Sequence, residues 1–377
     1  DRSPHSSFLP YGQLPVPRFL PFCRSPMARY LIVRLSAIGD VAMTIPVLYA
    51  VAKAYPQHSF TLLTQPFLTS LLINPPNNLE GMGIDIKHEE SSLVGLLTYI
   101  GRLKDEQFDY VIDLHNVIRS KIIRFYLRFF GVKGFSLKKP RLQLRQLTAK
   151  PPKKPTRLPS VIERYAQVFH KAGLEIHPPY PILLNDSGHI STELPIVEIG
   201  SGHHLIGIAP FAGHEAKTYP PEKMHEVVRT LAERDDVQIF LFGGKGKEKN
   251  ILEQWADESP RIVSVAGLLS LPEELSLIHA LRCMVSMDSA NMHFASLVGT
   301  RVISIWCATH PAAGFLGYGQ RIEDCIGADL DCRPCSVFGN KPCFRKDYAC
   351  RTQIEPQLII NKIVSTLTDL NSDETEN

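Results

Sequence analysis

The sequence has no hydrophobic run long enough to cross a membrane. Its longest uncharged apolar stretch near the start, 41–52, has only twelve residues and is interrupted by Thr44 and Pro46, whereas a spanning helix needs about 20. Residues 1–26 contain six prolines and lack the continuous apolar core of a signal peptide. We therefore expect residues 1–26 to be a disordered leader that precedes a natural start at Met27.

The sequence also has almost no net charge. The balance of 41 Lys and Arg against 38 Asp and Glu gives only +3, which is too little to predict a nucleic-acid partner. Residues 131–162, however, hold nine basic residues and no acidic one, namely Lys133, Lys138, Lys139, Arg141, Arg145, Lys150, Lys153, Lys154 and Arg157. This basic segment could hold phosphates or an anionic membrane face, or it could be a solvated loop.

The common nucleotide-binding fingerprints are missing from the glycine-rich segment 242–248. The order of its glycines fits neither GxxxxGK[ST] nor GxGxxG. This absence weighs against NAD-dependent and ATP-dependent enzymes.

The chain has more residues than one hydrophobic core usually organises. At 377 residues, two domains are expected. Apolar runs predict two series of strands that alternate with helices, the strands being 31–35, 59–63 and 110–113, then 205–209, 237–242, 262–265, 284–287 and 302–306. The alternation predicts an α/β fold of two doubly wound domains with parallel sheets. We place these domains at 27–195 and 196–352, followed by a C-terminal helix and acidic tail at 353–377.

Ligands of doubly wound folds bind at the carboxyl ends of the strands, so the turns there are candidate sites. The first turn ends in Gly39-Asp40 and places a carboxylate at the entrance to a helix, facing the expected cleft. An aspartate at a helix N-cap is a common structural feature, so capping is the alternative to a functional role. The glycine before it favours a sharp turn at the mouth of the first strand.

Two turns of the second series could bind an anion. The helix that follows Asp288 would present the backbone N–H groups of residues 289–291 to a diphosphate, with His293 one turn further on. Lys217 precedes a helix that opens on proline, and its ammonium could reach a phosphate oxygen. For each residue alone, a cap or a packed core side chain is the structural alternative.

Taken together, these turns resemble those of the ADP-heptose:lipopolysaccharide heptosyltransferases. The segment Arg34-Leu-Ser-Ala-Ile-Gly-Asp40 is similar to the RxSxxGD turn of that family, and Asp288-Ser-Ala-Asn-Met-His293 is similar to its donor turn. The family is inverting and has two Rossmann-like domains facing each other across a cleft, the GT-B type. The resemblance extends from Arg29 to about Ile363.

The resemblance implies that the Asp40 carboxylate deprotonates an acceptor hydroxyl, whose oxygen attacks the anomeric carbon of an ADP-sugar. The implied donor-binding residues are Lys217, Glu248, Asp288, Ser289, Ala290 and His293. The implied acceptor-binding residues are Ser36, Asp113, His115, Asn116, Arg119 and Lys121. No metal or other cofactor is implied, because lysine, histidine and the helix dipole take the place of a cation.

The chain departs from the family pattern at two places. Ala290 stands where the family usually has glycine, so the backbone approaches the diphosphate less closely there. Trp306-Cys307 stands where a Gly-Pro-like turn is common.

Four of the eight cysteines are close together in sequence, namely Cys332, Cys335, Cys343 and Cys350. They could bind a structural zinc ion or form two disulfides. Because the chain shows no export signal, free thiols or zinc are favoured over disulfides.

The implied enzyme would be cytoplasmic, at the inner face of the inner membrane, with a lipid-anchored saccharide acceptor and the basic segment against an anionic surface. One alternative is a nucleotide-sugar epimerase or hydrolase, against which the acceptor turn 113–121 counts. Another is a nucleic-acid or anionic-surface binding protein that uses residues 131–162 and the cysteines. Only Phe135 is aromatic in that segment, so base stacking, and with it a nucleic-acid partner, is not expected.

Overall fold

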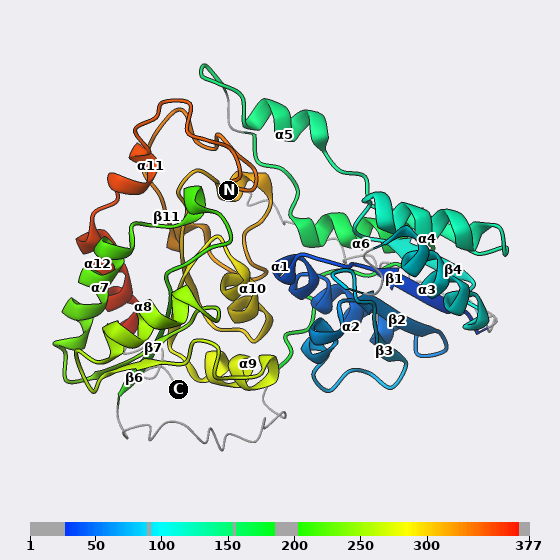
Figure 1. Ribbon diagram of the computed structural model, residues 1–377, viewed down its shortest axis with the longest axis horizontal. Helices are drawn as coiled ribbons and strands as arrows, with labels where there is room; N and C mark the ends of the chain where they lie inside the picture. The colour runs from blue at the N-terminus through cyan, green and yellow to red at the C-terminus, as the bar shows by residue number, and fades with distance from the viewer. Residues whose placement is uncertain (1–26, 89–91, 154–155, 185–202, 369–377) are drawn as a thin grey trace, which may run out of the picture.

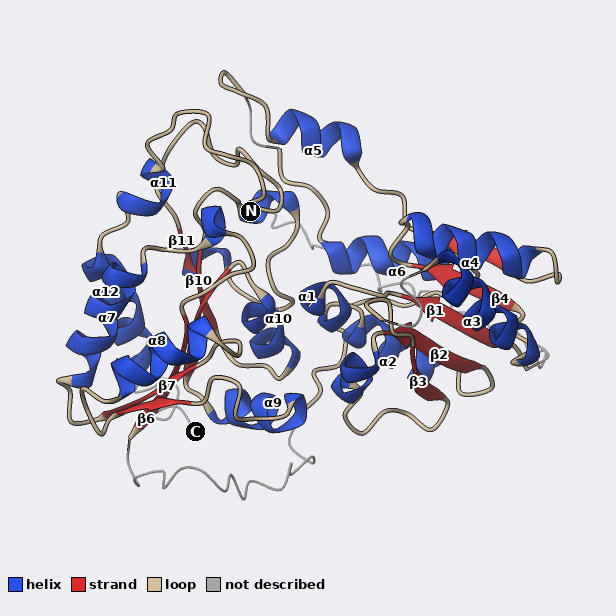
Figure 2. Cartoon of the chain, viewed as in Figure 1, coloured by secondary structure: helices blue, strands red, loops and turns tan. Residues whose placement is uncertain are grey.

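A computed structural model of the protein describes residues 27–88, 92–153, 156–184 and 203–368. Two parallel β-sheets, each with helices packed around it, lie side by side (Figures 1 and 2). The predicted leader 1–26, the predicted boundary at 195 and the acidic tail lie outside the described residues. Within the described ranges, no helix is both long and apolar enough to pass through a bilayer.

The first sheet has five parallel strands in the order β3-β2-β1-β4-β5. They are β1 (Arg29–Val33), β2 (Ser59–Thr64), β3 (Leu79–Gly83), β4 (Tyr110–Asp113) and β5 (Lys133–Ser136). The chain leaves the central β1 toward one edge through β2 and β3, and then returns to pair β4 with the other side of β1. The space above β1 and β4 is therefore the point where the strand order reverses, and ligands of this fold bind there.

The second sheet has six parallel strands in the order β11-β10-β9-β6-β7-β8. They are β6 (His204–Ala209), β7 (Val237–Leu241), β8 (Ile262–Ser264), β9 (Cys283–Met287), β10 (Val302–Ile305) and β11 (Cys325–Ile326). This is the strand order of a dinucleotide-binding Rossmann domain, and it reverses between β6 and β9.

Helices cover both sheets. The first half carries α1 (Ile38–Ala42), α2 (Ile45–Ala54), the 3-10 helix η1 (Pro66–Leu71), α3 (Leu93–Asp105), α4 (Ile118–Arg128), α5 (Arg141–Leu147) and α6 (Val161–Lys171). The second half carries the 3-10 helix η3 (Glu215–Lys217), α7 (Pro221–Ala232), α8 (Lys247–Ala256), α9 (Leu271–Ala280), α10 (Ala290–Leu297), the 3-10 helices η4 (Pro311–Ala313) and η5 (Ile322–Asp324), α11 (Ala349–Thr352) and α12 (Pro356–Thr368). The last helix, α12, packs against α7.

Residues 38–54 form two short helices, α1 and α2, rather than one continuous helix. Thr44 lies between them, and its hydroxyl donates to the Val41 carbonyl at 2.6 Å. Pro46, the second residue of α2, has no N–H to continue the earlier helix. The short strands β3, β5 and β11 and the helices α4 and α5 were not predicted. Strands β3 and β5 contain glycine and are largely exposed, so they lack the continuous apolar run of a buried strand.

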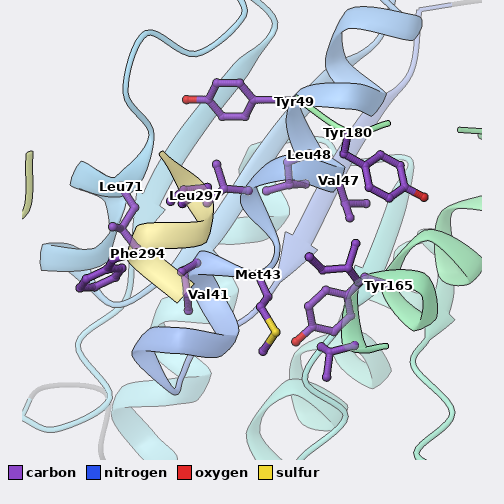
Figure 3. Packing of buried hydrophobic residues seen from close by; sticks show 14 of the residues in the cluster. Val41, Met43, Val47, Leu48, Tyr49, Leu71, Tyr165, Tyr180, Phe294 and Leu297 are labelled. Carbon is purple, nitrogen blue, oxygen red and sulfur yellow. The ribbon is translucent and has the colours of Figure 1, made fainter. Parts of the chain in front are cut away.

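The two halves share one hydrophobic cluster. In it, Val41 of α1 and Leu71 of η1 pack with Phe294 and Leu297 of α10, and all four are almost fully buried. Figure 3 shows these side chains gathered between the elements of the two halves. Burying a side chain of this size stabilises by about 1.5–3 kcal/mol, so the cluster holds α10 against α1.

Candidate active site

The candidate site lies where the two points of strand reversal face each other. Asp40 follows β1 and Asp113 ends β4, while Lys217 follows β6 and Asp288 follows β9. These are the four strands that flank the two reversals. Figure 1 shows α1 and α10, which begin after β1 and β9, meeting between the sheets.

Asp40 is the third residue of α1 rather than its N-cap. The N-cap is Ala37, whose backbone N–H lies 3.4 Å from the Asp40 Oδ2 atom. The carboxylate also forms an ion pair with Arg34, and 22% of the side chain is exposed. The capping contact is therefore long and weak, while about a fifth of the side chain remains exposed.

Arg34 is a site residue to which the sequence analysis assigned no role. It is buried at the end of β1, and one of its guanidinium nitrogens donates to the Leu114 carbonyl at 2.9 Å. The guanidinium carbon lies 5.9 Å from the centre of the Tyr165 ring. The available signal was a charged residue inside a buried apolar run, because arginine is rarely buried without a partner.

Lys217 and Asp288 form an ion pair with 2.9 Å between Nζ and Oδ2, and only 16% and 6% of their side chains are exposed. The two residues were predicted from separate turns, and the structure brings them together. Gly339, in the cysteine-containing loop, packs on the aliphatic part of Lys217, since a Cβ atom there would lie 2.4 Å from Cγ. The Lys217 side chain is thus held by a carboxylate at its ammonium and by the loop along its aliphatic part.

His293 is buried in α10 beside α1. A Cβ atom on Gly39 would lie 2.6 Å from its Cδ2 atom, so the imidazole of one half touches the backbone that precedes Asp40. Burial lowers the pKa of His293 to about 4, against the opposing effects of Asp288 and Asp40. Its Nδ1 atom is buried and has no partner among the described residues. The ring is therefore neutral near pH 7 and retains an unused polar atom.

The start of α10 matches the predicted anion site in part. Ser289 is the N-cap and Ala290 the first residue, and the Ser289 hydroxyl interacts with Ser286 at 3.1 Å rather than capping the helix. The first backbone N–H groups of α10 thus receive no side-chain cap. Beside them, Asn291 donates to Glu274 of α9 at 2.9 Å, and burial raises the pKa of Glu274 to about 7.

Glu248 caps its own loop. It lies in the first turn of α8, where its carboxylate accepts the Gly244 N–H at 2.7 Å. The Trp306 and Cys307 carbonyls, at the other departure from the family pattern, accept bonds of 2.5 and 2.7 Å from Arg333. The Glu248 carboxylate and the Trp306-Cys307 turn are therefore both held by hydrogen bonds within the second half.

The predicted acceptor turn has a buried structural centre. Asp113 is fully buried, and its Oδ1 atom accepts the N–H groups of His115 at 3.0 Å and Asn116 at 2.7 Å. Arg124 lies 3.6 Å from Oδ2. The Asn116 amide donates to the Leu137 carbonyl at 2.7 Å. Asp113 and Asn116 therefore shape the turn.

Three other predicted acceptor residues line one pocket of about 440 Å³, namely Ser36, His115 and Arg119. Burial and the nearby Arg34 lower the pKa of His115 to about 3. Lys121 lies instead on the outer side of α4, in a different hollow.

Residues of the basic segment are bound into the structure at two points. Lys139 is half-buried, and its pKa is lowered by burial and by Arg34, while Asp113 and Asp40 act in the opposite sense. Lys153 donates to the carbonyls of Cys332 and Pro334. Lys154 lies outside the described residues. A simple solvated loop therefore does not describe this segment.

The four clustered cysteines are free thiols, and burial raises the pKa of Cys350 to about 11. Within the part of the chain that the structure describes, no three or more His, Cys, Asp or Glu side chains are arranged to hold a metal ion. The predicted zinc site therefore has no geometric support here and stays a prediction.

Comparison with known proteins adds an independent line of evidence. The sequence model described as glycosyltransferase family 9 (heptosyltransferase) matches residues 97–342. Lipopolysaccharide heptosyltransferase 1 of Pseudomonas aeruginosa is 23% identical over 361 residues, which cover 90% of this chain and 98% of that protein. Lipooligosaccharide heptosyltransferase 2 of Haemophilus ducreyi is 25% identical over 301 residues, covering 75% of this chain and 84% of that protein.

Solved structures show the same fold. That of the E. coli ADP-heptose LPS heptosyltransferase II has a TM-score of 0.68 at 18% identity, covering 91% of this chain and 99% of that one. That of the E. coli heptosyltransferase WaaC with ADP has a TM-score of 0.64 at 18% identity, covering 90% and 99%. The predicted fold class, two Rossmann-like doubly wound domains of GT-B type, is confirmed.

Proposed function

The chain belongs to glycosyltransferase family 9, the heptosyltransferase family, and we propose that it moves a heptose from ADP-heptose to a hydroxyl of a lipopolysaccharide core. The predictions of the family and of the enzyme class are confirmed. The family match does not favour the epimerase or hydrolase alternative, nor a nucleic-acid binding protein.

One observation carries the proposal for the residues. Asp40, paired with Arg34, lies near enough to His293 of the other half to act on its pKa, and the Lys217–Asp288 pair acts on the same imidazole. A base on one domain, with an ammonium and a neutral imidazole on the other, suits transfer between two bound substrates. A binding protein would not need a partly exposed carboxylate beside these groups.

In the proposed reaction, an Asp40 carboxylate oxygen accepts the proton of the acceptor hydroxyl. The acceptor oxygen then forms a bond to the anomeric carbon, and the bond from that carbon to the diphosphate breaks, with the electron pair leaving on the diphosphate. Attack from the opposite face inverts the anomeric configuration. Arg34 is the positioning residue, because its ion pair fixes the carboxylate.

Charge grows on the leaving diphosphate, and donors already in place stabilise it most. We assign this role to Lys217 and to the uncapped N–H groups at the start of α10. Asp288 orients Lys217 at 2.9 Å, which leaves the other ammonium hydrogens available to phosphate oxygens. The neutral His293 ring stabilises the same region through its unused nitrogen.

The acceptor pocket at Ser36, His115 and Arg119 lies on the first half, next to the Asp40 turn. We propose that a lipid-anchored saccharide binds there, with Lys139 near its anionic groups. Asp113 and Asn116 would act by shaping the pocket wall. The enzyme would work at the cytoplasmic face of the inner membrane, which holds such an acceptor.

The proposed chemistry uses protein groups in the places where other transferases use a metal ion. A structural zinc at the four cysteines is a separate question, which metal analysis of the purified protein answers. A stoichiometric zinc content that is lost in a Cys332→Ser variant would establish such a site.

The test of the catalytic proposal is turnover of ADP-heptose with a lipid A core acceptor by wild type and Asp40→Ala. We expect turnover to fall by a factor of at least about 100, since general acid–base catalysis contributes roughly 10²–10⁴-fold. The affinity for ADP, measured by calorimetry, should change little.

Glu163→Ala is a matched control for capping. Glu163 is the third residue of α6, and its carboxylate accepts the Ser160 N–H at 2.7 Å, as a capping carboxylate does. The control should keep its turnover. An Asp40→Ala protein that folds normally and retains the full rate would show that Asp40 is only a structural residue of α1.

A further inference from the structure

The outer face of α3 and α4 exposes large apolar side chains that no described part of the chain covers. On α4, Ile118, Phe125 and Phe129 are 77%, 65% and 72% exposed. They recur at helical spacing along one side of the helix. With Leu97 of α3 they line an open hollow of about 1160 Å³ that reaches the edge strand β5. We call Leu97, Ile118, Ile122, Phe125 and Phe129 the α3–α4 face.

Basic residues surround this face. Lys121, Arg128 and Lys133 border the hollow, together with Arg124, which also approaches Asp113. The sequence has no acidic residue from Leu114 to Ile162. On these two helices, the acidic residues lie at the C-terminal end of α3. They are Asp105 and the C-cap Glu106, and Glu106 is paired with Arg29 at 3.3 Å.

The α3–α4 face adjoins the acceptor pocket. Ile118 lines both the hollow and the 440 Å³ pocket that contains Ser36, His115 and Arg119. A saccharide whose lipid anchor is held at the α3–α4 face would therefore enter the pocket directly past Ile118.

We propose that the α3–α4 face docks the enzyme onto an anionic lipid bilayer. Aromatic and aliphatic side chains flanked by Lys and Arg are the composition of helices that lie in a membrane interface. A second copy of the chain is a poorer occupant, because a symmetric contact would place this basic surface against itself. The proposal deepens the proposed function, since it names the face that brings the enzyme to a lipid-anchored acceptor.

The docking surface differs from the one expected from the sequence. Charge alone indicates residues 131–162. In the structure, Lys153 of that segment donates to the carbonyls of Cys332 and Pro334, and Lys139 is half-buried. The apolar part of the surface is supplied by α4, which precedes the segment.

Binding is tested by co-sedimentation of the full chain with vesicles of phosphatidylglycerol and phosphatidylethanolamine, and with vesicles of phosphatidylcholine, without donor or acceptor. We expect binding to the anionic vesicles that weakens at high salt. The Phe125→Ser/Phe129→Ser variant should bind at least about tenfold less, because each aromatic loses its apolar contact with lipid. Arg128→Glu should lower binding roughly fivefold or more, as one basic residue lost at an anionic surface predicts.

Matched controls carry comparable substitutions elsewhere. Leu358→Ser changes a 53% exposed side chain on α12, and Arg229→Glu changes an exposed charge on α7. Both should bind vesicles as the wild type does. All variants should keep the wild-type melting temperature and their turnover of a deacylated, water-soluble acceptor.

Equal binding to neutral and anionic vesicles, or equal losses in the controls, would overturn the proposal. Dimerisation in light scattering that the double Phe variant abolishes, without vesicle binding by the wild type, would assign the face to a second copy instead. Failure of the catalytic proposal is seen separately, as turnover that does not depend on Asp40.

Discussion

The contact between Gly39 and His293 predicts what a single methyl group would do. Gly39 precedes the proposed base, and His293 belongs to the other half. In a Gly39→Ala variant, the new Cβ would lie 2.6 Å from His293 Cδ2 and 3.6 Å from the Ala290 Cα. Non-bonded carbon atoms prefer about 3.5–4.0 Å, so the imidazole and the methyl group must separate by about 1 Å.

Little room exists for that movement. His293 is buried, and its helix is packed into the cluster shared by the two halves. Overpacking of such a site costs about 1–3 kcal/mol. For domains of 150–250 residues, each kcal/mol lowers the melting temperature by about 2–4 °C, which predicts a fall of roughly 2–12 °C.

The assay is a thermal melt with and without ADP, together with turnover. Gly39→Ala should melt earlier and turn over more slowly, because the base and the donor turn are pushed apart. Gly101→Ala in α3 is the matched control, since a Cβ there would meet no atom within 4 Å. It should stabilise by about 0.5–1 kcal/mol through helix propensity. Wild-type stability and turnover in Gly39→Ala would refute the idea that the halves meet at this contact.

Two further predictions concern the charges behind this contact. Burial lowers the pKa of His293 to about 4, below the ordinary value of about 6.5. The stability that the neutral imidazole contributes is therefore complete above pH 6.5 and is lost as the pH falls toward 4. The loss in the free energy of unfolding amounts to at most about 3 kcal/mol. Urea unfolding between pH 7 and pH 4 should show a shallower decline for His293→Gln, and an unchanged slope would contradict the assignment. For the Lys217–Asp288 pair, Lys217→Met and Asp288→Asn should each destabilise by up to about 3–5 kcal/mol, with part of the loss recovered in the double variant. Strictly additive losses in the three unfolding curves would show that the two groups do not interact.

Much of the fold could be predicted because local pattern and structure coincide. Buried parallel strands read as short apolar runs, and β4 begins and ends where its run does. Strands β3 and β5 were missed because they lie toward or at a sheet edge, are largely exposed and contain glycine. Helix α4 was missed because Ile118, Phe125 and Phe129 face outward while Ile123 and Leu127 are buried, so the helix lacks the single apolar face of a core helix.

The candidate site was predictable in its parts. Asp40, Lys217 and Asp288 each follow an apolar strand, and a residue in such a turn reaches the ligand side of the sheet whatever the strand order is. The resemblance to a family then gave these residues roles. Glu248 and Asp113 satisfied the same pattern, yet their carboxylates are used within their own loops.

The sequence by itself determined which residues end the strands, and hence the chemical groups available to the site. Only the tertiary structure decided that Asp40 pairs with Arg34, that Lys217 pairs with Asp288 across 71 positions, and that His293 touches Gly39 of the other half. The physical reason is that strand order and domain packing arise from burial summed over the whole chain, to which no single turn contributes a readable signal. The same holds for the α3–α4 face, whose exposed aromatics are recognised only once the core is known to lie on the other side of the helix.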